Sequence, residues 1–136
     1  MNIDTKAHSL VELRIPRRPE YLRVVRLLVS GYVSRFPAPV DMVEDIKVAV
    51  SEACNCSMRG ADPACAEGRL GISCSVEDDR LCFEIRDENA TSPPDSNSDE
   101  ASLGLLLIRT LMEDVEVRAE KDGGVVISMK KTIISV

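Results

Sequence analysis

Apolar and polar residues alternate near the start of the chain, over residues 9–15 ("SLVELRI"). A period of two places Leu13 and Ile15 on one face of a strand and Glu12 and Arg14 on the other. We therefore expect a β-strand with one buried face, which ends at the proline that follows it.

Two helical patterns follow, in which apolar residues recur every three or four positions. Residues 19–36 start with a proline, which the first turn of a helix tolerates because its missing N–H has no helical partner there. Residues 40–58 carry acidic side chains in the first two turns, where the helix dipole favours them. The sequence "PAP" at 37–39 separates the two segments, so we expect two helices in succession.

The second half of the chain contains two further pairs of strands and one apolar helix. Alternation on both sides of Asp78–Asp79 predicts a β-hairpin over 69–77 and 80–86. A helix and two strands are expected after it, over residues 103–115, 115–120 and 125–134. This order favours an α/β domain of the α+β two-layer type, with a mixed, mostly antiparallel sheet and helices on one face.

A polar segment interrupts this pattern at residues 88–102, which are rich in turn-forming residues and almost free of apolar side chains. A loop of this length inside a compact domain is usually functional or disordered. We therefore expect one domain over residues 1–136, with a flexible lid at 88–102.

Composition restricts the classes of protein to which the chain can belong. With 136 residues, 44% of them hydrophobic and only 3% aromatic, one globular domain with an aliphatic core is expected. The net charge of −6 argues against general binding to nucleic acid or to anionic membranes, since both require a positive surface. No run approaches the ~20 apolar residues of a membrane helix, and no signal-peptide pattern is present, so a cytoplasmic protein is expected.

The five cysteines are an odd number and lie mostly within apolar patterns, which favours reduced thiols over a disulfide framework. Cys54 and Cys56 are ~200° apart on a helix and cannot hold one ion together. The only histidine, His8, lies near the start of the chain, so no metal site is predicted. A thiol- or metal-sensing switch built on Cys54, Cys56 and Cys65 remains an alternative.

Three stretches of the chain, "PEYLRVVRLLVSG", "VEDIKVAVSEAC" and "LGLLLIRTLMEDVEV", carry a resemblance to a known family. Together with the order of elements, they resemble the anti-sigma factor serine kinases of bacterial sporulation and stress regulation. That family belongs to the ATPase superfamily of histidine kinases, Hsp90-type chaperones and gyrase. The resemblance spans residues 9–133 and implies a histidine-kinase-like ATPase fold that binds ATP or ADP with Mg²⁺.

The first motif of that family is a helix with a glutamate that activates the attacking hydroxyl and, four residues later, an asparagine that holds Mg²⁺. Glu52 matches the glutamate, but Cys56 stands at the fourth position and Asn55 at the third. With ~100° per residue, position 56 lies about +40° from Glu52 and position 55 about −60°. Asn55 is therefore predicted to point away from the Mg²⁺ position, unless a rare π-bulge restores it. The thiol of Cys56 is a poor ligand for so hard an ion.

The second and third motifs of the family contact the base and the phosphates. In Asp-x-Gly-x-Gly the acid reads the adenine amino group; here Asp87 is present, while Asn89 and Thr91 replace both glycines. Asn tolerates a positive φ better than the β-branched Thr does. The glycine-rich turn at the start of a helix, where free N–H groups favour phosphate, keeps Gly104 but has Ser102 in place of the earlier glycine.

The resemblance also implies partners: a sigma factor and an anti-anti-sigma (STAS) protein, with Arg23 on the partner-binding helix, and a homodimer. We expect a regulatory protein in which partner binding persists while the nucleotide site is weakened. The alternative is an active serine protein kinase, with Glu52 as base, Asp87 on adenine and Gly104 on phosphate. In that case Asn55 or a water completes the Mg²⁺ site. The sequence therefore does not decide whether the chain is an active kinase.

Overall fold

The computed structural model describes residues 10–59, 68–88, 90, 99–121 and 123–133, and of residues 99–102 the backbone only. Within these residues five strands form one sheet: β1 Val11–Pro16, β2 Arg69–Glu77, β3 Arg80–Asp87, β4 Glu113–Ala119 and β5 Val125–Thr132. Three α-helices and a short 3-10 turn accompany them: η1 Pro19–Tyr21, α2 Leu22–Val33, α3 Val40–Arg59 and α4 Asp99–Leu111. None of the described helices is long and apolar enough to cross a membrane.

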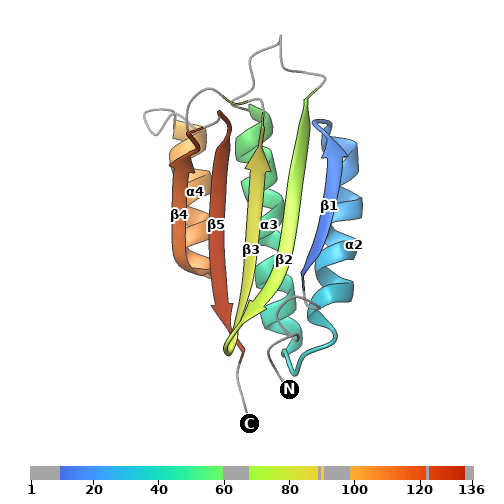
Figure 1. The fold of residues 1–136 in the computed structure, drawn as a ribbon. Helices are drawn as coiled ribbons and strands as arrows, with labels where there is room; N and C mark the ends of the chain where they lie inside the picture. The colour runs from blue at the N-terminus through green and yellow to red at the C-terminus, as the bar shows by residue number, and fades with distance from the viewer. Residues whose placement is uncertain (1–9, 60–67, 89, 91–98, 122, 134–136) are drawn as a thin grey trace.

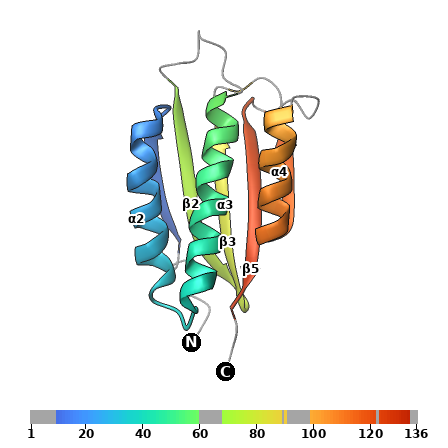
Figure 2. The ribbon, with the colours of Figure 1, turned by 180° about the vertical axis from the view of Figure 1, so that it is seen from behind.

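The sheet has the strand order β1-β2-β3-β5-β4, and each of its four pairings is antiparallel. The chain leaves β3, passes through α4 and returns in the edge strand β4, and the final hairpin then places β5 next to β3 (Figure 1). Seen from behind, α2, α3 and α4 lie side by side over one face of the sheet (Figure 2). The predicted α+β sandwich with helices on one face is confirmed, with a sheet that is antiparallel at every described pairing.

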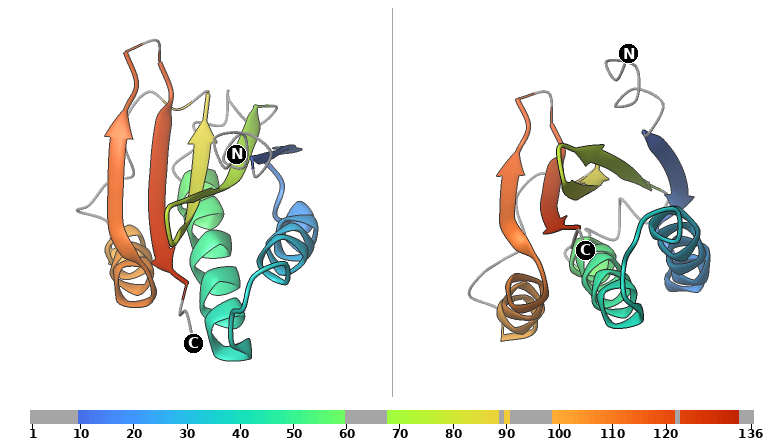
Figure 3. Two further views of the ribbon diagram at one scale, coloured as in Figure 1. Left: turned by 60° about the horizontal axis from the view of Figure 1, so that its bottom comes forward. Right: turned by 90° about the horizontal axis from the view of Figure 1, so that it is seen from below.

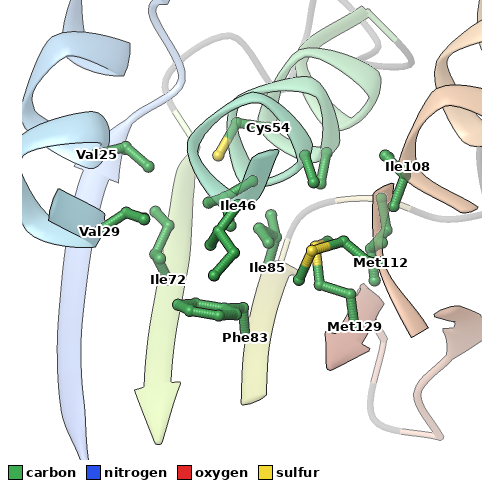
Figure 4. Packing of buried hydrophobic residues seen from close by; sticks show 14 of the residues in the cluster. Val25, Val29, Ile46, Cys54, Ile72, Phe83, Ile85, Ile108, Met112 and Met129 are labelled. Atoms are coloured by element: carbon green, nitrogen blue, oxygen red, sulfur yellow. The ribbon is translucent and has the colours of Figure 1, made fainter. Parts of the chain in front are cut away.

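The hydrophobic core lies between the helical layer and the sheet, as the view from below shows (Figure 3). It is aliphatic apart from a few residues, and Phe83 of β3 is its largest fully buried side chain. Side chains from both layers meet around this ring (Figure 4), among them Val29, Ile46, Ile85 and Met129. The opposite face of the sheet carries polar side chains, and no described helix covers it.

Two of the helices differ from the prediction at their boundaries. The first predicted helix begins as the 3-10 turn η1 and is α-helical only from Leu22 to Val33. The last helix begins at Asp99, inside the predicted lid. The sequence did not predict this start, because the first turn of the helix is polar and shows no apolar periodicity. The helix ends at Leu111 rather than at 115, since Asp114 has a φ of 46° and a register shift interrupts the β4–β5 pairing between Glu113 and Glu116. The predicted lid residues 89 and 91–98 lie outside the described residues.

The position of Phe83 at the centre of the core predicts a large loss of stability when its ring is removed. Phe83→Ala should lower the free energy of unfolding by about 3–5 kcal/mol, because it combines lost burial with a cavity. Leu27→Ala is the matched control, since this side chain is 72% exposed and such changes usually stay within about 0.5 kcal/mol. Urea unfolding measures both; equal losses would contradict this description of the core.

Candidate functional site

The predicted site residues come from three elements that meet at one end of the molecule. Glu52, Asn55 and Cys56 lie in the second half of α3, Asp87 is the last residue of β3, and Gly104 lies in α4. The stripe of α3 that includes Ile46, Ala49, Val50 and Ala53 is fully buried. This burial fixes the rotation of α3 and with it the direction of each site residue.

At Gly104, side chains of α3 come close to the backbone of α4. A Cβ atom at this position would lie 2.6 Å from Glu52 Oε1, 2.8 Å from Cys56 Sγ and 3.3 Å from Arg59 Nη2. Distances under 3.0 Å are steric clashes, so any larger residue at 104 would displace these side chains. The structure therefore brings Glu52, Cys56 and Gly104 together, and it adds Arg59, a residue that the sequence analysis did not identify.

Arg59 interacts with both α3 side chains that face Gly104. Its Nη2 donates a hydrogen bond to Glu52 Oε1 at 2.8 Å and lies 3.7 Å from Cys56 Sγ. Burial, and secondly the negative charge of Glu52, raise the pKa of the Cys56 thiol, and Arg59 opposes this only in part. Near neutral pH Cys56 is therefore a protonated thiol. We refer to these three residues as the Glu52–Cys56–Arg59 cluster.

Asn55 faces a different part of the surface. It lines a groove of ≈330 Å³ between α2 and α3, together with Arg26 and Ser51, where Arg26 Nε donates to Ser51 Oγ at 3.1 Å. Glu52 also borders this groove. Because α3 is a regular α-helix from Val40 to Arg59, no π-bulge rotates Asn55 toward Gly104. This is the orientation that the helical geometry predicted.

Asp87 is buried and engaged by an arginine that the sequence analysis missed. Arg17 Nη2 lies 3.0 Å from Asp87 Oδ2, and the two side chains are only 1% and 2% exposed. The same Nη2 donates to the main-chain oxygen of Ser57 near the end of α3, at 2.7 Å. Nothing in "IPRRPE" distinguishes Arg17 from Arg18, which is exposed, so only the tertiary structure reveals this contact.

A second glycine shapes the surroundings of Asp87. Gly124 has a φ of +98°, and a Cβ there would lie 2.9 Å from the main-chain oxygen of Asp87 and 3.3 Å from Glu88 Cα. Its N–H donates to the main-chain oxygen of Ala90 at 3.1 Å. Glycine is thus required for the β4–β5 turn to pack against the end of β3. The sequence predicted a turn here but not this contact.

Two further predicted site residues lie partly or wholly outside the residues that the structure describes. Asn89 is outside the described residues, and only the backbone of Ser102 is described. Ser102 was expected in the turn where a helix starts, and it is instead the fourth residue of α4, which begins at Asp99. Gly104 is consequently the sixth residue of the helix, beyond the first four N–H groups that lack helical partners. Its N–H is not one of the free donors that attract phosphate.

The residues present do not fit the Mg²⁺-bound nucleotide that the family implies. A protonated thiol stands at the position that the resemblance assigns to the Mg²⁺ ligand, which would have to be an oxygen. The carboxylate expected to read adenine is paired with Arg17, and the helix that would expose free N–H groups begins five residues before Gly104. Among the described residues, no group of three or more His, Cys, Asp or Glu side chains forms a metal site.

The outer surface of the helical layer exposes several apolar side chains. Leu27 of α2 and Leu103 and Leu106 of α4 are each more than 60% exposed. Arg23, the predicted partner-binding residue, is also exposed on α2. Because α3 lies between α2 and α4 (Figure 2), Leu27 is separate from the two leucines of α4, and single exposed apolar side chains of this kind are common on soluble proteins.

Comparison with known proteins agrees with this arrangement of elements. Residues 15–131 match the histidine kinase-like ATPase domain family. The serine-protein kinase RsbW of Bacillus licheniformis is 36% identical over 93% of this chain and 87% of its own length. The RsbW protein of Bacillus subtilis is 34% identical over 89% of this chain and 84% of its own length.

Two solved structures share the fold at low sequence identity. The first contains the RsbU and RsbW domains of a Mycobacterium tuberculosis protein, and it matches with a TM-score of 0.67 at 15% identity. The match covers 90% of this chain and 32% of the longer Mycobacterium chain. The second is a chain of the SiaB–SiaC complex of Pseudomonas aeruginosa, with a TM-score of 0.60 at 13% identity over 91% of this chain and 89% of that one. The match over 15–131 and the RsbW relatives establish that this chain belongs to the histidine kinase-like ATPase family.

Proposed function

We propose that the chain is an anti-sigma-type regulatory protein that acts by binding partner proteins and has a weakened nucleotide site. Its partners are a sigma factor and an anti-anti-sigma (STAS) protein, and a homodimer in the cytoplasm belongs to the same proposal. The similarity to the RsbW serine-protein kinases supports this class of function. The proposal also treats residues 1–136 as one domain; of the lid predicted at 88–102, residues 99–102 belong to α4.

The Glu52–Cys56–Arg59 cluster is the observation that carries this proposal. Phosphoryl transfer depends on positioning and on the neutralisation of charge by Mg²⁺. In this chain the residue at the Mg²⁺ position is a protonated thiol, and the glutamate that would activate a hydroxyl is paired with Arg59. The fold of the family is retained, since residues 15–131 match its model. We therefore infer that the chain can bind partners in the structure it has. Phosphoryl transfer would require an oxygen ligand in place of the Cys56 thiol and a Glu52 that is not paired with Arg59.

The second candidate is an active serine protein kinase, and one observation favours it. The Glu52–Arg59 ion pair is partly open to water, with side chains 21% and 41% exposed. Pairs of this kind contribute only about 0.2–1 kcal/mol, so a ligand or substrate can displace Arg59 easily. Glu52 also borders the groove that Asn55 lines, from which a hydroxyl group can approach it. Two obstacles remain, the missing Mg²⁺ ligand and the pairing of Asp87 with Arg17.

Calorimetric titration with ATP and ADP, with and without Mg²⁺, separates the two candidates. We expect no Mg²⁺-dependent binding to the wild type, and a gain of about tenfold in ATP affinity with Mg²⁺ when Cys56→Asn is combined with Asn55→Thr. The single change Asn55→Thr is the control, because it leaves the thiol in place. Micromolar, Mg²⁺-dependent binding of ATP to the wild type would favour the kinase. If the double variant binds ATP no more tightly than the wild type, the missing asparagine is not the limiting defect.

Charge reversal on α2 tests the partner-binding surface. Arg23→Glu should weaken binding to the sigma factor by roughly tenfold or more, since it replaces attraction with repulsion at an exposed helix face. Arg69→Glu is the matched control, because Arg69 is also exposed but lies on the helix-free face of the sheet. Pull-down followed by titration with purified sigma factors measures both; equal effects of the two variants would exclude α2 as the contact.

Thiol reactivity tests the alternative of a redox switch. Burial raises the pKa of Cys54 and of Cys74 to about 12, and it also raises the pKa of Cys56 and Cys82. In a Cys65→Ser variant the four remaining thiols should therefore react slowly with a disulfide reagent at pH 7, and faster as the pH rises above about 9. The same variant unfolded in guanidinium gives the full count of four. One rapidly reacting native thiol at neutral pH would support the redox switch.

A further inference from the structure

We propose that Arg17 closes the base end of the nucleotide site by occupying the carboxylate of Asp87, so that this chain excludes adenine through its own side chain. The inference rests on the proposed function, because it explains how the nucleotide site is weakened. It concerns a residue that lies outside the three motifs of the family.

The geometry shows that Arg17 connects three segments around Asp87. The arginine follows β1, Asp87 ends β3, and the oxygen of Ser57 belongs to the last turn of α3. One nitrogen of Arg17, Nη2, reaches both Asp87 Oδ2 at 3.0 Å and the Ser57 oxygen at 2.7 Å. With both side chains at most 2% exposed, water does not weaken this contact.

The chemistry of the contact makes Arg17 a direct competitor of adenine. The amino group of adenine is a neutral N–H donor in a planar ring system, and a carboxylate oxygen is the acceptor it needs. The guanidinium of Arg17 presents the same kind of donor with a positive charge, and charge-assisted hydrogen bonds are roughly twice as strong as neutral ones. A neutral amine therefore cannot displace Arg17 from Oδ2 while the arginine stays in place.

The main chain holds Arg17 at this position. Its N–H donates to the oxygen of Gly68 at 3.2 Å, and the preceding Pro16 is the last residue of β1, paired with Arg69 of β2. The side chain thus starts from the ordered end of a strand rather than from a loop. Removal of the guanidinium, rather than its rotation, is the change that opens Asp87.

Hydrogen bonding around Arg17 is incomplete, which argues against a purely stabilising role. Its Nε and Nη1 atoms are buried, and they have no hydrogen-bond partner in the structure as described. Buried donors without partners are costly, and apolar side chains often replace buried ion pairs without loss of stability. An arginine here is therefore a poor choice for stability alone, which is consistent with a role in keeping the site closed.

The experiment uses adenosine and guanosine as probes, without phosphates and without Mg²⁺. In Arg17→Ala we expect adenosine to bind at least tenfold more tightly than in the wild type, as measured by ligand-observed NMR titration. Guanosine should not gain, since it carries an oxygen where adenine carries the amino group. The gain should disappear in Arg17→Ala combined with Asp87→Asn.

Arg14→Ala is the matched control. Arg14 lies three residues earlier and forms the exposed pair with Glu88 at 2.8 Å, so its removal also breaks an arginine–carboxylate contact at the end of β3. It should leave the affinity for adenosine unchanged. Arg17→Met keeps the apolar stem of the side chain and replaces Arg17→Ala if that variant unfolds.

Three results would overturn the proposal. One is a folded Arg17 variant that binds adenosine no better than the wild type; another is a gain that survives Asp87→Asn. The third needs no Arg17 variant: adenosine binding to the wild type that Asp87→Asn abolishes would show that Arg17 does not exclude the base. Because neither Mg²⁺ nor a partner protein takes part, failure here is separate from failure of the sigma-factor experiments.

Discussion

The rotation of α3 about its own axis is the constraint on which the rest of the site depends. Ile46, Val50 and Ala53 are completely buried on its inner side, and burial of each Val or Ile side chain contributes about 1.5–3 kcal/mol. A shift of one residue would turn the helix by ~100° and expose this stripe. Packing in the core, rather than the chemistry of the site, therefore decides that Cys56 faces α4 and that Asn55 faces the groove beside α2.

The two carboxylates of the site are both paired with arginines, but the two pairs differ in strength. Water reaches the Glu52–Arg59 pair, which lowers its contribution to that of an ordinary surface contact. The Arg17–Asp87 pair is buried, and removal of one partner from such a pair commonly costs about 3–5 kcal/mol. The Arg17–Asp87 contact is consequently harder to open than the Glu52–Arg59 contact.

Sequence periodicity was sufficient to locate the five strands and the helices α2 and α3, because apolar side chains recur on one side of most of these elements; β4 is the exception, since none of its side chains is buried. It failed at the start of α4, where residues 99–102 are mostly polar and join the helix without an apolar pattern. The helical geometry predicted the direction of Asn55 correctly, since α3 is regular. It could not identify Arg17, because an ion pair between distant segments leaves no periodic signal and Arg18 is an equally basic neighbour. Arg59, by contrast, lies seven residues after Glu52 on the same helix, so the helical spacing could have revealed its pairing with Glu52.

Gly104 has a consequence for how such sequences are interpreted. The glycine is required here because α4 packs against Glu52 and Cys56, and Gly124 is required because its turn packs against the end of β3. Both requirements are steric, and both hold whether or not a nucleotide is present. At Gly124 the glycine records the closeness of two backbones, whereas at Gly104 it records the closeness of α3 side chains to the α4 backbone, so neither glycine by itself indicates kinase activity. The residue four positions after the glutamate, and the one that faces the strand-end aspartate, are the more informative markers of activity.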